Sequence, residues 1–162
     1  MRVEDIMTRS VKVVRPETPM VEVVTAMCLY RVSGLPVVEG DERLIGIVSE
    51  KDVLARMFPT LDDLMEGMAG VDLDEMMGTY KEVFRLKVAD LMSYTPITVR
   101  PETHILKASA TMASHQFRRI PVAEDGSLVG MVSLGDVHKA IFQTNVQEAI
   151  GRPQVVEEVE SD

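Results

Sequence analysis

The chain contains no tryptophan and a single cysteine, Cys28. One cysteine excludes a disulfide within the chain and fits a reducing compartment, so we expect a cytoplasmic protein. Because Cys28 lies in an apolar helical pattern, we expect its thiol to be buried and inert. No apolar run approaches the roughly 20 residues that a membrane span needs, and the first residues lack the apolar region of a signal peptide. We therefore expect no membrane partner.

Basic residues are outnumbered, with 17 Lys and Arg against 26 Asp and Glu, which gives a formal net charge of −9. A charge of this sign disfavours attraction to the phosphates of nucleic acid and to anionic membrane surfaces. We therefore expect no direct binding to nucleic acid, and any such role would belong to a partner protein.

The dominant feature that is present is a tandem repeat of about fifty-five residues. Residues 3–14 match 88–99, Leu35-Pro36-Val37 matches Ile120-Pro121-Val122, and residues 46–52 match 130–136 after a one-residue slip in a polar loop. A single repeat is near the size at which burial barely offsets chain entropy, so we expect the two repeats to share one core. They would face each other across a pseudo-twofold axis with paired clefts between them.

The repeat divides the chain into four parts. These are repeat 1 (1–57), an acidic, methionine-rich linker (58–87), repeat 2 (88–143) and a C-terminal extension with an acidic tail (144–162). The linker is too long to lack structure, so we predict one or two amphipathic helices, broken near Gly67–Gly70. Two roles remain open for it: packing on the module or across a dimer, or presenting a methionine-lined surface to a partner helix. Four methionines would line that surface: Met65, Met68, Met76 and Met77.

Hydrophobic periodicity predicts the order strand, helix, strand, strand, helix in each repeat, an α+β (α/β) fold. In repeat 1 we predict a strand at Val11–Val14, a helix with Thr18 as N-cap and Pro19 as first residue, hairpin strands Leu35–Glu39 and Leu44–Ser49, and a helix from Ser49 to Met57. In repeat 2 we predict strand Pro96–Val99, helix His104–His115, strands Ile120–Glu124 and Leu128–Ser133, and helix Gly135–Phe142.

One polar motif, Ser-x-x-Asp, occurs where the last strand of each repeat meets its last helix, as Ser49-x-x-Asp52 and Ser133-x-x-Asp136. A fixed carboxylate can accept two hydrogen bonds from the vicinal diol of a ribose. The serine hydroxyl can donate to ribose or phosphate beside a helix N-terminus, which favours anions. The same spacing is close to a capping box that only begins a helix. A copied cap looks like a copied site, so the residues alone leave both interpretations open.

These features together resemble the cystathionine-β-synthase-type (CBS) domain. The resemblance rests on the openings Asp5-Ile6-Met7-Thr8 and Asp90-Leu91-Met92-Ser93, the hydrophobic-Pro-Val strand and the closing Gly-x-Val-Ser-x-x-Asp. It covers both copies along their length. It implies a compact disc of two repeats, commonly paired into a homodimer, that regulates an effector protein and does not catalyse. The expected ligands are AMP, ADP or ATP in an energy-sensing role, with S-adenosylmethionine, NAD and cyclic di-AMP also possible for the family.

The resemblance also assigns site residues. Asp136 and Asp52 would bind ribose, and Ser133 and Ser49 ribose or phosphate. Arg118 and Arg119, the two residues before Ile120-Pro121, would reach phosphates, and Lys51 would cross to the opposite ligand. Because Ser33 and Gly34 occupy the matching places in repeat 1, we expect the Asp136 cleft to be the better site. The base would lie against four residues of repeat 2: Thr95, Ile97, Ile120 and Met131.

Metal and catalytic motifs are missing from the sequence. His104, His115 and His138 lie on separate predicted elements without ligand spacing, so we predict no metal site, and magnesium only with a bound polyphosphate. Neither a phosphate-binding Gly-x-x-x-x-Gly-Lys loop nor a Gly-x-Ser-x-Gly nucleophile motif occurs, so we predict no enzyme. Two other hypotheses compete with the ligand-binding module. One is a ligand-free dimeric scaffold that docks a partner through the linker, and the other is a nucleotide hydrolase.

Overall fold

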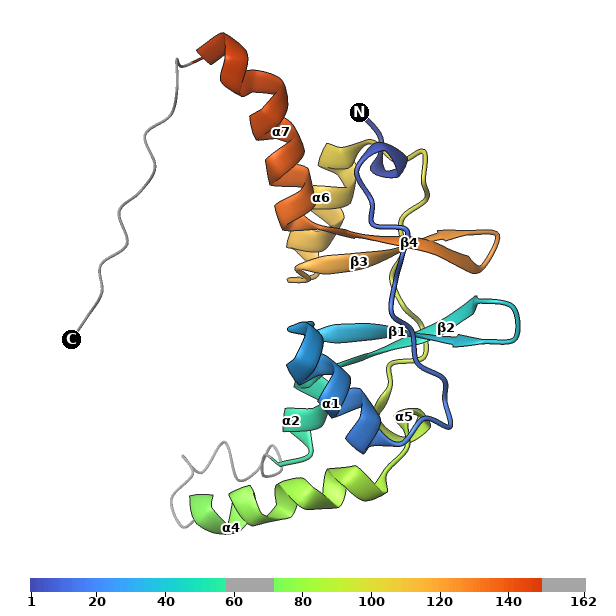
Figure 1. Cartoon of the computed structure of the whole chain (residues 1–162), viewed down its shortest axis with the longest axis vertical. Coiled ribbons are helices and arrows are strands. Elements are labelled where there is room, and N and C mark those ends of the chain that lie inside the picture. Colours follow the sequence, from blue (N-terminus) through green and yellow to red (C-terminus); the bar gives the residue numbers. More distant parts are fainter. Residues whose placement is uncertain (58–71, 150–162) are drawn as a thin grey trace, which may run out of the picture.

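Two β-hairpins of matching register form the centre of the molecule, whose computed structural model describes residues 1–57 and 72–149 (Figure 1). The first hairpin consists of β1 (Gly34–Glu39) and β2 (Arg43–Ser49), and the second of β3 (Arg119–Glu124) and β4 (Ser127–Ser133). Pro36 pairs with Ile47 as Pro121 pairs with Met131, and the register shifts at the same place in both hairpins. Both predicted hairpins are confirmed.

The hairpins meet at their turns, where Arg43 of β2 pairs with Ser127 of β4. The Leu44 amide donates to the Gly126 carbonyl and the Leu128 amide donates to the Glu42 carbonyl, each at 2.9 Å. This reciprocal pair relates the two halves by a pseudo-twofold axis and produces a four-stranded sheet of order β1-β2-β4-β3. The predicted fold class, helices with antiparallel strands in two similar units, is confirmed.

Helices flank each hairpin on one side (Figure 1). The first half carries α1 (Met20–Tyr30) and α2 (Glu50–Ala55), and the second carries α6 (Ile105–Ser114) and α7 (Leu134–Ala149). Pro19, not Thr18, is the N-cap of α1, because the Thr18 hydroxyl instead accepts a hydrogen bond from the Arg15 amide at 3.0 Å. Helix α7 extends seven residues beyond its predicted end at Phe142.

The linker is helical where it is described. It contains α4 (Leu73–Thr79) and the 3₁₀ helix η2 (Tyr80–Arg85), and α5 (Val88–Leu91) follows. The Asp72 carboxylate caps α4 by accepting from the amides of Asp74 and Glu75. The predicted break near Gly67–Gly70 lies outside the described residues, as do Met65 and Met68.

The strands predicted at Val11–Val14 and Pro96–Val99 do not form. Val14 makes one parallel bridge to Val37, and Val99 makes one to Val122. The reason is that each segment crosses from one hairpin to the other. The first pairs with β4 at Thr8 before it reaches β1 at Val14, and the second pairs with β2 at Ser93 before it reaches β3 at Val99. Extended chain is present, but only its end lies beside a strand.

The apolar side chains form two cores, each completed by the opening segment of the other repeat. Val3 and Met7, at and just after the 3₁₀ helix η1 (Val3–Asp5), pack with α6, α7 and the second hairpin. Val88 and Met92 pack with α1 and the first hairpin. The expectation of one shared core is therefore wrong. The strand pairing between the hairpins lies at their turns, and the strands of each hairpin belong to a different buried cluster.

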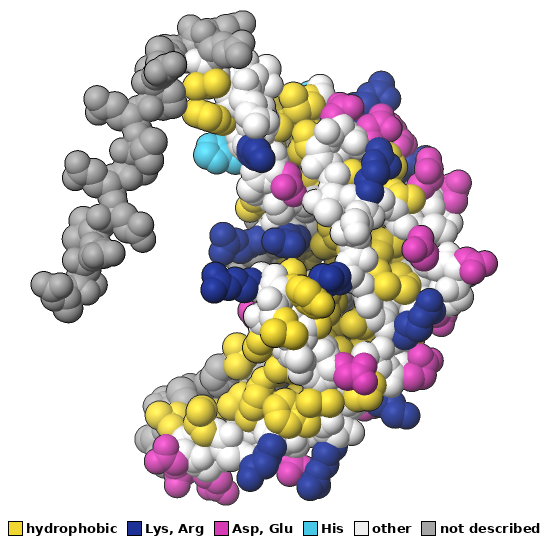
Figure 2. All heavy atoms as spheres, in the orientation of Figure 1, with side chains coloured by type: hydrophobic (Ala, Val, Ile, Leu, Met, Phe, Trp, Pro, Cys, Tyr) yellow, Lys and Arg dark blue, Asp and Glu magenta, His cyan; other side chains and the backbone are white. Residues whose placement is uncertain are grey.

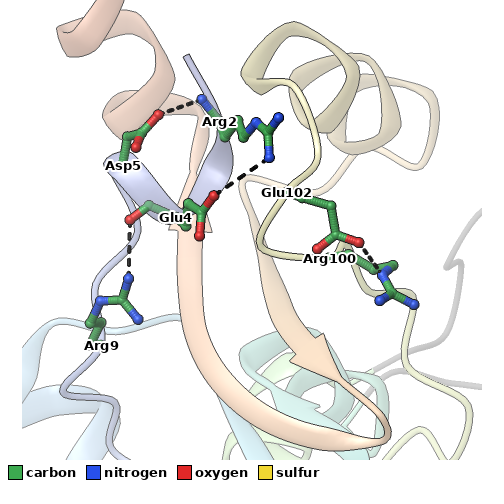
Figure 3. A network of polar contacts seen from close by, with 6 residues as sticks. All are labelled: Arg2, Glu4, Asp5, Arg9, Arg100 and Glu102. Carbon is green, nitrogen blue, oxygen red and sulfur yellow. Dashed lines mark hydrogen bonds and ion pairs between the residues drawn. The ribbon is translucent and has the colours of Figure 1, made fainter.

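Backbone bonds fasten the exchanged N-terminal segment to the second half. The Val3 amide donates to the Thr103 carbonyl at 2.8 Å and the Glu4 amide to the Pro101 carbonyl at 2.9 Å. Figure 3 shows exposed polar contacts around the same segment, including Arg2 with Glu4 at 3.9 Å and Arg100 with Glu102. Exposed ion pairs contribute at most about 1 kcal/mol each, whereas a buried Val or Met side chain contributes about 1.5–3 kcal/mol. Burial of Val3 and Met7 therefore contributes most to holding the N-terminal segment of repeat 1 against the second half.

Cys28 is exposed, so the prediction of a buried thiol is wrong. Helix α1 buries Met20, Val23 and Met27, a narrow stripe at helical spacing. Cys28 follows Met27 by one residue and therefore points about 100° away from that stripe.

Candidate functional site

Each Ser-x-x-Asp motif forms a capping box at the start of a helix. Asp136 Oδ2 accepts from the Ser133 amide and from Ser133 Oγ, both at 2.8 Å, and the Asp136 amide donates to Ser133 Oγ at 3.1 Å. Asp52 Oδ2 accepts from the Ser49 amide at 2.7 Å and from Ser49 Oγ at 3.0 Å. The capping interpretation of the motif is confirmed. In both motifs the cap uses one carboxylate oxygen, Oδ2.

The two oxygens of the Asp136 carboxylate differ in their hydrogen bonds. In the part of the chain that the structure describes, Oδ2 takes both side-chain hydrogen bonds of this carboxylate and Oδ1 takes none. The Asp136 side chain, in the first turn of α7, is half-buried and lines a cavity. The hydrogen bonds to Ser133 restrain the orientation of this carboxylate.

The cavity beside Asp136 has a volume of about 360 Å³, within the range of small-molecule sites. Its more buried lining is apolar and comes from both repeats: Val11, Leu35, Pro36, Met131 and Val132. Its exposed lining is polar or charged and includes Lys12, Tyr30 and Arg119. The cavity therefore has a more buried apolar part, its floor, and an exposed part that carries two cations, its rim; the half-buried Asp136 also lines it.

Of the three basic residues predicted to bind phosphate, one lines this cavity. Arg119 lines it. Arg118 and Lys51 do not, and both are exposed; the Arg118 carbonyl accepts a hydrogen bond from the Leu134 amide at 3.0 Å. Figure 2 shows Lys and Arg side chains gathered at the waist between the two halves, on the side that carries the helices. Among the described residues the ion pairs involve Arg2, Arg85 and Arg100, and none involves Arg118 or Arg119.

The predicted base-binding wall is mostly elsewhere. Met131 lines the Asp136 cavity, but Thr95 and Ile97 do not, and Ile120 is fully buried in the core of the second half. The residues that match Thr95 and Ile97 in the other repeat, Ser10 and Lys12, line the cavity instead. The exchange of opening segments explains the difference, because Thr8 rather than Ser93 pairs with β4 and brings residues 10–12 beside Asp136.

Sequence reasoning missed Lys12 and Tyr30. Lys12 Nζ lies 3.7 Å from the centroid of the Tyr30 ring, and both residues line the cavity. A signal for Lys12 exists in the repeat, because its match in the second copy is the apolar Ile97. A charged residue in one copy of the repeat and an apolar residue in the other indicate that the two positions have different surroundings.

The resolved pKa shifts lie outside the cavity. Burial is the largest of the causes that raise the pKa of Tyr80, which packs against the core of the first half. Two further groups are exposed and paired with each other. The pKa of Glu102 is lowered by a hydrogen bond from its own backbone and by Arg100, and Glu102 in turn raises the pKa of Arg100. None of these three groups lines the cavity, so the description of the cavity rests on its lining residues and their charges.

Comparison with known proteins decides the family. The family model of the CBS domain matches residues 3–58 and 88–143. The chain belongs to the CBS domain family. This CBS-domain protein is 30% identical over 155 residues to the uncharacterized protein MJ1426 of Methanocaldococcus jannaschii, a match that covers 88% of the chain and 92% of the relative.

One plant relative has been crystallised with a nucleotide. The CBS-domain protein is 30% identical over 156 residues to chloroplastic CBSX2 of Arabidopsis thaliana; the match covers 87% of the chain but 63% of that relative. The crystal structure of CBSX2 in complex with AMP superposes on the chain with a TM-score of 0.69 at 31% identity, covering 89% of this chain and 98% of that one. The match therefore spans under two thirds of the full-length relative but nearly all of the crystallised chain.

The described residues contain neither a cluster suited to a metal ion nor a membrane-spanning helix. Within residues 1–57 and 72–149, no group of His, Cys, Asp and Glu side chains is placed to hold a metal ion. Among the helices of the described part of this CBS-domain protein, none has the length and apolar character required to cross a membrane.

Proposed function

We propose that this CBS-domain pair is a non-catalytic regulatory module that binds an adenosine nucleotide, AMP, ADP or ATP, in the cavity beside Asp136. One observation carries the proposal. A half-buried carboxylate, whose Oδ1 accepts no hydrogen bond from the described residues, lines a cavity of about 360 Å³ that also has an apolar floor and a cationic rim. The AMP complex of CBSX2, 31% identical, supports the same ligand class.

The arrangement favours one orientation of the ligand. The Asp136 carboxylate accepts the ribose diol through Oδ1 while Oδ2 keeps the helix cap, and Ser133 supports it. The base lies on the apolar floor, against Val11 and Met131, and the phosphate faces Arg119 at the rim. Arg118 and Lys51 act at longer range as part of the positive waist, and magnesium accompanies only a polyphosphate. The Asp52 cleft, with Ser49, is the weaker second site, since Gly34 stands where the other repeat has Arg119.

Occupancy would be signalled through the contact between the two halves. A ligand that contacts Asp136 of one repeat and Val11 of the other binds best when the two repeats are positioned so that both residues line the cavity. It therefore stabilises that relative position of the repeats, by the difference between its affinities for this and other positions. We propose that a homodimer of the module presents this change to an effector protein in the cytoplasm.

Isothermal titration calorimetry with AMP, ADP and ATP tests the proposal, using Asp136→Asn. This variant keeps an oxygen for the cap and removes the charge that accepts the diol, so we expect affinity to fall at least tenfold, about 1.4 kcal/mol. Asp90→Asn is the matched control. Asp90 Oδ2 accepts a hydrogen bond from the Lys87 amide at 2.8 Å in a similar cap and does not line the cavity, so the same substitution there should leave affinity unchanged. Unchanged affinity in Asp136→Asn contradicts the assignment of the site.

A scaffold function is the second candidate, favoured by apolar side chains that the linker leaves exposed. Leu73 and Met77 of α4 are 62% and 70% exposed. Under this hypothesis the linker docks a partner helix and the cavity binds no nucleotide. Replacing Met76 and Met77 by Ser would then abolish capture of the partner, and no nucleotide would raise the Tm of the wild-type protein. A nucleotide-dependent rise in Tm contradicts it.

A further inference from the structure

The rim of the Asp136 cavity contains a lysine that rests on an aromatic ring. Lys12 Nζ lies 3.7 Å from the centroid of the Tyr30 ring, and both side chains line the cavity together with Arg119. Lys12 comes from the segment that crosses from the second half to the first, so it reaches the cavity from the opposite repeat to Asp136. No described acidic side chain forms an ion pair with it.

The charges of the lining are unbalanced. Its charged side chains are two cations, Lys12 and Arg119, and one carboxylate, Asp136. The chain as a whole carries a formal charge of −9, so two cations that form no ion pair with any described residue run against its overall composition. The carboxylate is already fixed by its cap to Ser133. The excess positive charge therefore lies at the exposed rim, where an anionic part of a ligand would meet solvent.

We propose that Lys12 is a phosphate-binding residue, and that Lys12 and Arg119 together make this cavity select phosphorylated adenosine over adenosine and over cationic adenosyl sulfonium compounds. The inference rests on the proposed nucleotide-binding function and adds a residue and a ligand class to it. A lysine whose ammonium lies over a ring face keeps three N–H donors on a flexible stem, so the ammonium can turn from the Tyr30 ring to a phosphate oxygen. In the second repeat Ile97 holds the matching position, so the Asp52 cleft lacks this contact.

The test compares AMP with adenosine, which differ by the phosphate alone. Calorimetry on the full chain gives both dissociation constants for the wild type and for Lys12→Met, which keeps most of the stem and removes the charge. Loss of a hydrogen bond to a charged group corresponds to about a ten- to hundredfold weaker affinity for AMP, and affinity for adenosine stays within about twofold. Lys12→Arg restores most of the AMP affinity. Lys107→Met, at an exposed lysine of α6 away from the cavity, leaves both affinities unchanged.

A nuclear magnetic resonance measurement adds an independent readout. The Lys12 ε-methylene protons, next to the ammonium that lies over the Tyr30 ring, are expected to carry a ring-current shift. We expect AMP to change this shift and adenosine not to change it. Two results overturn the inference: AMP affinity that Lys12→Met does not alter, or equal losses for AMP and adenosine, which indicate a structural role. If the wild type binds neither compound, the proposed function fails as well. If the wild type binds AMP and Lys12→Met binds it equally, only the role of Lys12 fails. Lys12 is exposed, and a Tm for Lys12→Met equal to that of Lys107→Met verifies that the variant is folded.

Discussion

Thr8 and Met131 exchange both of their backbone hydrogen bonds, each 2.9 Å long. Ser93 and Ile47 repeat this exchange at 2.8 and 3.0 Å. Each opening segment is thereby attached to the last strand of the other repeat, directly before the Ser-x-x-Asp motif. This relationship builds the wall that faces Asp136 from residues of repeat 1, so the cavity exists only when the two repeats are together.

The close approach of these segments requires glycine at Gly46 and Gly130. A Cβ added to Gly130 would lie 2.8 Å from Met7 Sδ and 2.9 Å from the Thr8 carbonyl oxygen, and one at Gly46 would collide with Met92 and the Ser93 carbonyl. We expect Gly46→Ala and Gly130→Ala each to lower the free energy of unfolding by about 1–3 kcal/mol, with the larger effect at Gly46. Urea denaturation measures both.

Gly78 provides the control for these variants. It lies in α4 with no atom within 4 Å of an added Cβ. Gly78→Ala is expected to stabilise the protein by about 0.5–1 kcal/mol, since alanine favours the helix. A Gly46→Ala protein as stable as the wild type would show that the crossing segment does not press on β2.

Met7 is buried in the core of the second half although it belongs to repeat 1. Met7→Ala should therefore destabilise the protein by about 2–5 kcal/mol through the cavity it leaves. Hydrogen exchange would show the loss of protection first in β4 and α6, the elements it packs against, and later in β1. Met77→Ala, at an exposed methionine, should change stability by less than about 0.5 kcal/mol. Equal loss of protection in β1 and β4 would contradict the two-core description.

The asymmetry between the clefts predicts one nucleotide per chain. Arg119 lines the Asp136 cavity together with Gly34, its match in the first repeat. We expect calorimetric stoichiometry near one, and Arg119→Gly should weaken AMP binding about ten- to hundredfold by removing a charge-assisted hydrogen bond. Asp52→Asn should have a much smaller effect than Asp136→Asn. A stoichiometry of two with equal affinities would contradict this ranking.

The pKa of Glu102 provides a pH-dependent prediction. It is lowered by a hydrogen bond from its own backbone and by Arg100, so its small contribution to stability is present above its usual pKa and is lost as pH falls through the lowered value. Arg100→Ala should raise the pKa of Glu102 towards its usual range, in part, in a carbon-13 titration. Because both groups are exposed, about 1 M salt should reduce the difference between the variants. If Arg100→Ala leaves the pKa of Glu102 unchanged, Arg100 does not cause the lowering of that pKa.

Local patterns in the sequence were sufficient for much of the fold. The hairpins, the main helices and the two capping motifs follow from residues within a few positions of one another, such as Ser133 and Asp136. Helix α1 begins one residue later than predicted, at Met20 instead of Pro19, and α7 continues past its predicted end at Phe142. The strands expected at Val11–Val14 and Pro96–Val99 failed because β-branched residues predict extended chain, whereas a strand also needs a neighbour along its length.

The repeat, its pairing into two similar halves, and the Ser-x-x-Asp carboxylates were thus determined by the sequence itself. Which opening segment meets which half was decided by tertiary structure. Asp5-Ile6-Met7-Thr8 and Asp90-Leu91-Met92-Ser93 carry nearly the same pattern, so either would fit either core, and only the joint packing of both halves selects the exchange. That selection placed Ser10 and Lys12, rather than Thr95 and Ile97, beside Asp136. The composition of the cavity therefore depends on long-range contacts that no local pattern contains.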